Sequence, residues 1–371
     1  ALVNQCPNGI MHTRITSDKF ISLLEWIDEQ AEIDSFLKFN QEFCKSVNNS
    51  YEKANVIIIS GVCPVSSAQN NVSTALDLAN IARKHAKTKG DTTVFLFDEK
   101  VRKVTENEMY VVSKMTSALE NQEFVAFVQP KVSLETGKVI GGEALVRWIS
   151  KDGTMVYPNQ FIPVFEKNGF ITKVDFCVYE QILKYLKDAL ILGEEVVPIS
   201  INFSRKHLET PDFIENMGRY MKDYAVPAKF IEAEITESVF VMELDELKER
   251  VDEVHNMGIS VAIDDFGSGY SSLNVLAQIP ADVIKLDKKF FDFDTGKTRQ
   301  KQFIKYLIRM MKHMGVMTVM EGVETEEQVS FMKKCGCDAV QGYYYAKPMP
   351  LSEFRKFIRD FNDNVSEPVS S

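Results

Sequence analysis

The sequence is poor in the features that mark membrane proteins and disulfide-stabilised proteins. Its 371 residues contain no run of the ~18 consecutive apolar residues that a membrane-spanning helix needs. No signal-peptide pattern precedes the first polar residues. Six cysteines are spread widely along the chain: Cys6, Cys44, Cys63, Cys177, Cys335 and Cys337. Such spacing is typical of buried, reduced thiols, so we expect a cytoplasmic location.

Basic residues are also scarce. The chain has 43 Lys+Arg against 53 Asp+Glu, which gives a formal net charge of −10. Binding to a DNA or RNA polymer needs many Lys and Arg contacts to phosphate, so this balance argues against such a partner. A small anionic ligand held through a metal is left open. The chain begins at Ala1 and not at Met, so we expect it to be a fragment of a longer protein. An anchor or sensor upstream of this fragment is left open.

Residues 1–105 predict a small α/β domain. Short strand-like runs at 20–24, 55–61 and 93–97 alternate with helical patterns at 30–47 and 72–87. A polar stretch at 66–71 predicts a loop. Residues 106–121 form an amphipathic pattern, which predicts a helix that joins this domain to a second one.

From residue 122 to residue 365 the chain alternates strands and helices. Eight strand-like runs occur, at 124–132, 139–148, 196–203, 230–235, 260–264, 283–286, 316–320 and 339–345. Helical patterns at 174–190, 215–224, 243–257, 301–314 and 326–334 lie between most of them. This alternation predicts a (β/α)8 TIM-like barrel, with an open doubly wound sheet as the alternative. No glycine-rich phosphate loop follows any strand, which weakens the alternative.

Six polar residues stand within or near the carboxyl ends of five of these runs. They are Glu143, Asn202, Glu234, Asp264, Asp265 and Glu321. In a parallel barrel these ends share the face where active sites are built. Clustered carboxylates would repel, so the group needs cations. The oxygen ligands, with no histidine or cysteine at these ends, favour Mg²⁺ or Mn²⁺ over zinc.

The number of acids suits two ions, an arrangement used for attack on phosphate esters. Lys285, at the end of the sixth run, adds a cation that can steady an attacking hydroxide or a phosphate oxygen. It can equally serve to neutralise surplus carboxylates, and the two interpretations are compatible. Gly267-Ser-Gly269, one residue beyond the Asp pair, predicts a loop that approaches a ligand closely and moves.

These residues also carry a resemblance to a known family. The motifs run in order: QP at 129–130 with EALVRW at 143–148, FIP at 161–163, NFS at 202–204, EITES at 234–238, DDFGSGYSS at 264–272, IKLD at 284–287, EGVET at 321–325 and QGY at 341–343. Over about 240 residues the chain resembles the EAL-domain phosphodiesterases, which cleave the bacterial second messenger cyclic di-GMP to linear pGpG. A departure is Met320, where the family usually has Ala.

The resemblance implies a barrel whose first strand is antiparallel to the rest, and roles for individual residues. One metal would be held by Glu143, Asn202, Glu234 and Asp264, and a second by Asp264, Asp265 and Glu321. Lys285 matches the essential lysine near the attacking water. Glu324 and Gln341 would line the site, Glu237 would brace the loop after Asp265, and Gln129 and Arg147 would contact substrate phosphate. It further implies activation by Mg²⁺ or Mn²⁺, inhibition by Ca²⁺, and a homodimer formed through the barrel.

Residues 1–105 resemble part of a GGDEF (diguanylate cyclase) domain. The stretch at 79–97 is similar to its closing helix and strand, and Thr16-Ser-Asp-Lys-Phe20 stands where the Gly-Gly-Asp-Glu-Phe motif would be. Both glycines are replaced, and Lys19 takes the place of an acid. The first half of such a domain is missing. We therefore expect a degenerate regulatory or dimerising remnant without cyclase activity, or a domain that only packs beside the barrel.

Three functions are weighed against one another. The leading hypothesis is a two-metal phosphodiesterase acting on cyclic di-GMP, since no metal ligand and no lysine of the motif is lost. A catalytically silent cyclic di-GMP receptor is the main alternative. An aldolase-type barrel with Lys285 as a Schiff base is disfavoured, because a lysine among carboxylates should stay protonated.

Overall fold

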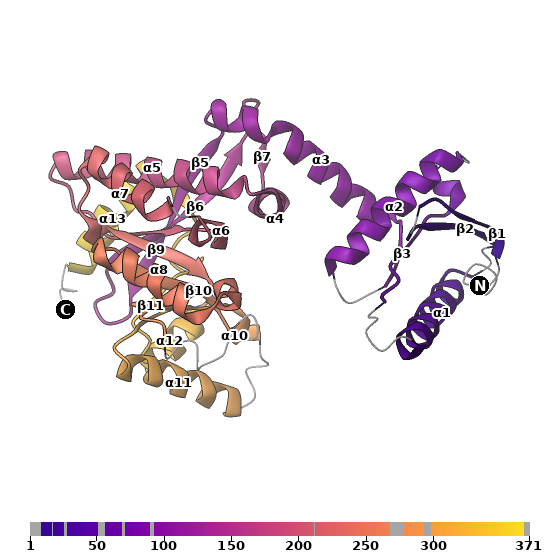
Figure 1. The fold of residues 1–371 in the computed structure, drawn as a ribbon. Helices are drawn as coiled ribbons and strands as arrows, with labels where there is room; N and C mark the ends of the chain where they lie inside the picture. The colour runs from indigo at the N-terminus through magenta and orange to yellow at the C-terminus, as the bar shows by residue number, and fades with distance from the viewer. Residues whose placement is uncertain are drawn as a thin grey trace. The chain divides into compact units, whose positions relative to one another are not determined.

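The computed structural model describes residues 9–16, 18–25, 28–50, 56–68, 71–89, 93–210, 212–267, 278–292 and 298–366 (Figure 1). The chain divides into two compact units, Ala1–Tyr110 and Val111–Ser371. Cys6, Ser17 and the second and third residues of the predicted loop at 267–269 lie outside the described residues. The other five cysteines are free thiols.

The first unit is a small α/β structure. Strand β1 (Gly9–Arg14) pairs antiparallel with β2 (Phe20–Leu24), and β3 (Ser60–Val62) pairs parallel with β4 (Val94–Leu96). Helices α1 (Glu29–Ser50) and α2 (Val72–Lys89) accompany them, with a short 3₁₀ helix, η2 (Val65–Ala68), where a loop was predicted. The prediction of that loop, at 66–71, was therefore wrong for residues 66–68. Ala82, Phe97 and Val101 form this unit's small buried core.

Helix α3 (Glu99–Glu120) begins seven residues before the helix predicted at 106–121. Its start is fixed by Asp98, whose side chain accepts a hydrogen bond from Val101 N at 2.8 Å. An acceptor at this position satisfies one of the free amides of a first helical turn. Val111 and Ala118 on the second half are buried in an aromatic cluster with Phe124 and Trp148, so this half is part of the second unit's core.

The second unit is a closed barrel of eight strands. In ring order they are β5 (Phe124–Ser133), β6 (Val139–Ile149), β8 (Ile199–Asn202), β9 (Ile231–Thr236), β10 (Ser260–Phe266), β11 (Val283–Leu286), β12 (Met317–Met320) and β13 (Ala339–Val340). Neighbours are parallel except that β5 is antiparallel to both β6 and β13. The predicted barrel and its antiparallel first strand are confirmed, and the open sheet is excluded.

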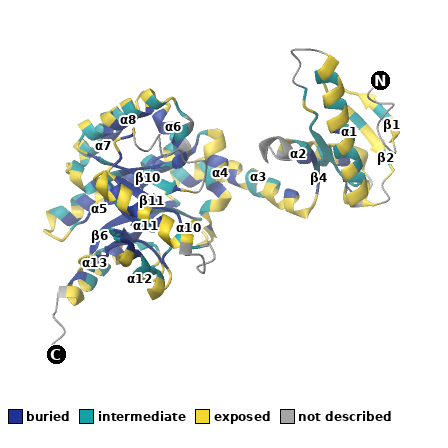
Figure 2. Cartoon of the chain, turned by 90° about the horizontal axis from the view of Figure 1, so that it is seen from below, coloured by how far each residue is buried: buried dark blue, intermediate teal, exposed yellow. Residues whose placement is uncertain are grey.

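Helices surround the barrel (Figures 1 and 2). They are α4 (Pro158–Asn168), α5 (Ile171–Ile191), α6 (Arg205–Leu208), α7 (Phe213–Tyr224), α8 (Leu244–Asn256), α10 (Lys289–Asp292), α11 (Thr298–His313), α12 (Glu326–Cys335) and α13 (Leu351–Ser366). Local sequence fixes their ends: Thr325 and Gln328 form a capping box at the start of α12, and Gly336 ends it at φ 85°. Neither α4 nor α13 was predicted.

The last predicted strand, 339–345, was too long. Only Ala339 and Val340 pair in the sheet. The chain then turns, because Gln341 N donates to Met320 O at 2.8 Å and Tyr344 N donates to Val323 O at 3.0 Å. This turn runs tightly against the segment after β12, so it fixes two segments that carry predicted site residues.

The turn leaves no space for a side chain at Gly342. An added Cβ would lie 2.1 Å from the carbonyl oxygen of Val323. We expect Gly342→Ala to lower the free energy of unfolding by about 1–3 kcal/mol, as overpacking does, measured by urea denaturation. Gly218→Ala in α7 is the matched control, since its Cβ meets only Met257 at 3.5 Å. It should be neutral or stabilising, because Ala favours helix. Equal stability of the two variants would contradict this packing argument.

Candidate metal centre

Two overlapping groups of carboxylates lie at the barrel's interior. Glu143, Glu234 and Asp264 form one group, and Asp264, Asp265 and Glu321 form the other. Within each group one oxygen of every residue lies within 4.8 Å of the others. The strand register brings them together: on β8 and β9, Asn202 pairs with Glu234, while Glu143 of β6 pairs with Ser200 of β8. Asp264 is common to both groups.

A bulge lets two consecutive aspartates join these groups. Successive residues of a regular strand point to opposite faces, so Asp264 and Asp265 would normally diverge. The pairing of β10 with β11 shifts between Ile263 and Phe266, and Asp265 adopts φ 56°. Aspartate tolerates this left-handed conformation better than most residues. The local distortion therefore brings a second carboxylate into reach of Asp264.

Lys285 lies in the middle of the acids and is fully buried. Its Nζ is 3.1 Å from Glu143 Oε2, 3.1 Å from Asp264 Oδ1 and 2.7 Å from Glu321 Oε1. It also contacts Glu234 Oε1. Burial alone would lower the pKa of Lys285, but the surrounding carboxylates hold this pKa well above its ordinary value. The side chain is therefore an ammonium ion at neutral pH.

One ammonium does not balance the negative charge around it. Burial and the neighbouring acids raise the pKa of Glu321 to about 8 and that of Asp265 to about 6, and they hold the pKa of Glu234 well above its ordinary range. Glu234 Oε2 and Asp264 Oδ1 are buried without a hydrogen bond, although Asp264 Oδ1 lies 3.1 Å from the Lys285 ammonium. Buried carboxylate oxygens without hydrogen bonds are costly, so these atoms fit the ligand set of hard divalent cations.

Side-chain amides orient Glu143. Asn202 Nδ2 donates to its Oε1 at 3.0 Å, and Gln341 Nε2 donates to its Oε2. The same Gln341 nitrogen lies 3.2 Å from Gln129 Oε1, and Gln129 Nε2 donates to Ala346 O at 3.0 Å. Hydrogen bonds to an ionised acid favour its charged form, and together with Lys285 they offset the effect of burial and lower the pKa of Glu143.

The other predicted site residues lie in different settings. Glu237, in the 3₁₀ helix η4 (Glu237–Val241), accepts a hydrogen bond at 3.0 Å from the backbone N of Gly267, which is two residues after Asp265. Arg147 is half-buried on β6 and stacks over Phe127, with 5.8 Å between its Cζ and the ring centroid. Glu324 is exposed after β12 and is not a member of either acidic group.

A buried polar network next to these acids was missed from the sequence. It consists of Lys131, Ser200 and Glu232, in which Lys131 Nζ donates to Glu232 Oε1 at 2.8 Å and to Ser200 Oγ. Each member stands two positions from a predicted site residue on the same strand. Because side chains two apart share a strand face, this spacing was the signal that could have found them.

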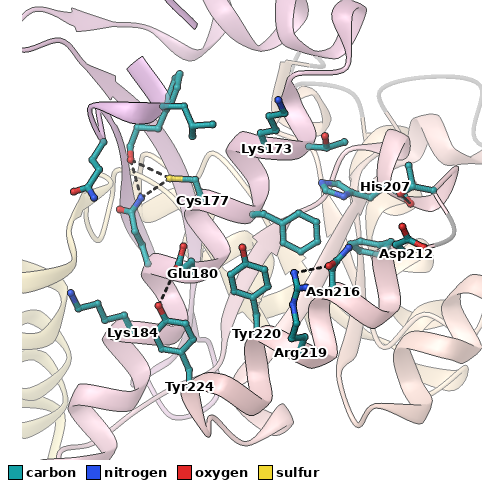
Figure 3. Close-up of a pocket in the computed structure, with 18 residues that line it drawn as sticks. Lys173, Cys177, Glu180, Lys184, His207, Asp212, Asn216, Arg219, Tyr220 and Tyr224 are labelled. Atoms are coloured by element: carbon teal, nitrogen blue, oxygen red, sulfur yellow. Dashed lines mark hydrogen bonds between the residues drawn. The ribbon is translucent and has the colours of Figure 1, made fainter. Parts of the chain in front are cut away.

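A groove of about 890 Å³ lies between α5 and α7 on the outside of the barrel (Figure 3). Aromatic and charged side chains line it, including Tyr220, Tyr224, Lys184 and Arg219. Tyr224 Oη donates to Glu180 Oε1 at 2.7 Å across it. None of the predicted site residues lines this groove. It is therefore separate from the acidic groups.

The chain is similar in sequence to curated proteins that act on cyclic di-GMP. The chain is 28% identical over 293 residues to the cyclic di-GMP phosphodiesterase NbdA of Pseudomonas aeruginosa, covering 79% of this chain and 37% of that protein. It is 26% identical over 344 residues to the bifunctional diguanylate cyclase/cyclic di-GMP phosphodiesterase MucR of the same organism, covering 92% and 50%. The chain thus spans half or less of the length of these two relatives.

Solved structures give the same likeness. The cyclic di-GMP complex of the PaMucR phosphodiesterase matches with a TM-score of 0.62 and 28% identity, covering 66% of this chain and 99% of that one. The cAMP-bound EAL enzyme Bd1971 matches with a TM-score of 0.63 and 27% identity, covering 70% and 73%.

Two further findings concern the chain as a whole. Among the residues that the structure describes, no helix combines the length and apolar character needed to cross a membrane. The family model described as "EAL domain" matches residues 113–348, which is more than half of the sequence and takes in both acidic groups. The chain therefore belongs to the EAL domain family.

Proposed function

We propose that this chain is a metal-dependent phosphodiesterase that hydrolyses cyclic di-GMP to linear pGpG. The observation that carries the proposal is the pair of acidic groups sharing Asp264, with the Lys285 ammonium in contact with both. The likeness to NbdA and to the cyclic di-GMP complex of PaMucR supports the substrate. The test is incubation with cyclic di-GMP and Mg²⁺ or Mn²⁺, followed by chromatography. Tight binding without linear product would instead favour a silent receptor.

The ligand set divides between two cations. Glu143, Asn202, Glu234 and Asp264 would hold one, and Asp264, Asp265 and Glu321 the other. When bound, such ions supply Lewis acidity toward a phosphate oxygen and lower the pKa of water. Gln129 and Arg147 would contact the substrate's phosphates, with Gln341 keeping Glu143 oriented. Glu237 would fix the segment after Asp265 through its bond to Gly267 N. Glu324 would meet the substrate from the rim.

Lys285 would not hold a metal ion but would stabilise negative charge. Its ammonium lies among the acids, where it stabilises negative charge that develops on an attacking water or a phosphate oxygen. The departing group is the ribose 3′ oxygen, which must gain a proton as the bond to phosphorus breaks.

Removing a ligand should differ from removing the lysine. We expect Glu143→Ala or Asp264→Ala to abolish hydrolysis, because each deletes a ligand and misplaces the rest. Lys285→Ala should lower turnover while binding of cyclic di-GMP is retained. The measurements are product chromatography and calorimetric binding of substrate. More than a tenth of wild-type turnover in either carboxylate variant at saturating metal would rule out those ligand assignments, and loss of metal binding in Lys285→Ala would rule out its role.

The all-oxygen ligand set predicts the metal dependence. Mg²⁺ or Mn²⁺ should activate hydrolysis, whereas Ca²⁺, which binds at longer distances in looser geometry, should permit substrate binding without cleavage. Turnover with each ion and with excess chelator is the measurement. Full activity in chelator would refute metal catalysis.

The first unit would be a degenerate GGDEF-like remnant that regulates the barrel. The alignment with MucR covers 92% of this chain and so extends into residues 1–110. Thr16 and Lys19 lie between β1 and β2, at the place where a cyclase motif would need glycine and an acid. Without those groups, two-metal phosphoryl transfer lacks its ligands.

Deleting residues 1–98 should leave hydrolysis measurable, perturbed by no more than several-fold. This cut keeps α3 whole, since Val111 and Ala118 belong to the barrel's aromatic cluster. Activity and circular dichroism of the truncated chain are the measurements. Complete loss of hydrolysis in a folded truncation, or synthesis of cyclic di-GMP from GTP by the intact chain, would contradict the regulatory role.

A homodimer formed through the barrel is supported by helix α11. Phe303, Tyr306 and Met310 on this helix, and Met314 directly after it, are 56%, 65%, 37% and 43% exposed. Their spacing of three and four residues places them on one face. We expect Phe303→Asp with Tyr306→Lys to convert a dimer to a monomer in light scattering. An unchanged mass would exclude α11 from the interface.

A further inference from the structure

A second buried lysine lies beside the metal ligand Glu234. Lys131 is on β5, and its Nζ is 2.8 Å from Glu232 Oε1 and 3.9 Å from Glu234 Oε2. Glu232 and Glu234 share one face of β9, since they are two residues apart. Burial alone would lower the pKa of Lys131, but Glu232 and Glu234 raise it above its ordinary value. A permanent positive charge therefore sits within a short reach of a ligand carboxylate.

Glu232 and Ser200 hold this ammonium in place. Lys131 Nζ donates to both, and the hydroxyl of Ser200 donates in turn to Glu232 Oε1. All three side chains are buried or nearly so. Closed, charge-assisted triangles of this kind are stronger than single neutral hydrogen bonds. The ammonium thus has two good partners that are not metal ligands.

The two carboxylate oxygens of Glu234 differ in their contacts. Its Oε1 contacts Lys285, whereas its buried Oε2 has no hydrogen-bond partner. The 3.9 Å between Lys131 Nζ and Oε2 exceeds hydrogen-bonding distance by about 1 Å. A lysine side chain covers that distance by small torsional changes, because its four-carbon stem is flexible. The hydrogen bonds to Glu232 and Ser200 compete with a bond from this ammonium to Oε2.

We propose that Glu232, together with Ser200, holds the Lys131 ammonium away from Glu234, so that this carboxylate's second oxygen stays available to a divalent cation. Glu232 is a positioning residue, because it acts through Lys131 and not on substrate. The inference deepens the proposed function and rests on its assignment of Glu234 as a metal ligand.

The test measures Mn²⁺ binding by calorimetry in the absence of substrate. Glu232→Gln removes the competing carboxylate, and Lys131 should then bond to Glu234 Oε2. We expect the Mn²⁺ dissociation constant to rise tenfold or more, the size of effect known for partners of metal ligands. Adding Lys131→Met to Glu232→Gln removes the freed ammonium. The double variant should return to within about threefold of wild type, since removing both charges of a buried pair is often tolerated.

Controls separate this role from a general loss of structure. Glu194→Gln, in a surface pair with Arg355 at 3.1 Å, alters a carboxylate of the same kind away from the acids and should leave Mn²⁺ binding unchanged. Ser200→Ala loosens the triangle without changing charge. Ser200→Ala should weaken Mn²⁺ binding about threefold. If Glu232→Gln does not fold, the Mn²⁺ affinity of Ser200→Ala tests the inference in its place.

The outcomes are distinct. Rescue by the second substitution supports the inference where the single variant is folded, because the recovered Mn²⁺ affinity then follows from removal of the freed ammonium and not from recovery of the fold. A folded Glu232→Gln with wild-type affinity, a double variant without recovery, or an unaffected Ser200→Ala overturns the inference while the phosphodiesterase proposal stands. A wild-type chain that binds no Mn²⁺ overturns both.

Discussion

The confinement of like charge inside the barrel is the constraint on which the rest of the site depends. Four carboxylates lie within 3.1 Å of a single ammonium, that of Lys285. Such a group opposes folding, because each buried charge loses its hydration and repels its neighbours. The closed ring of strands holds the acids together, and divalent cations would supply the charge that the ammonium alone does not.

The side chains around the acids also respond to this crowding of negative charge. Glu143 accepts hydrogen bonds from two amides, those of Asn202 and Gln341. The carboxylate of Glu232 is neutralised by Lys131, which leaves Glu234 as the less satisfied acid. Glu143 and Glu234 are both proposed as metal ligands, but they differ in their hydrogen bonds. Two amides hold Glu143 in orientation, whereas Oε2 of Glu234 has no hydrogen-bond donor.

The sequence predicts the ring of strands well, because runs of apolar residues between helical patterns depend on local periodicity. It also identifies Asp264 and Asp265, although alternation would have separated them. What makes them neighbours is the bulge after Ile263 and the φ of 56° at Asp265, which depend on pairing with β11 and have no local signal. The short β13 was overestimated for a similar reason. Its end is set by hydrogen bonds from Gln341 and Tyr344 to a distant segment.

The same ring of acids decides what chemistry Lys285 can perform. A Schiff base requires a neutral amine with a free lone pair. The carboxylates around Lys285 hold its pKa well above the ordinary value even though burial opposes this, so the neutral amine is not formed near neutral pH. The contacts of Lys285 with four carboxylates therefore argue against an aldolase-type mechanism. In the proposed mechanism the lysine acts through its fixed charge, and bound cations would balance the remaining acids.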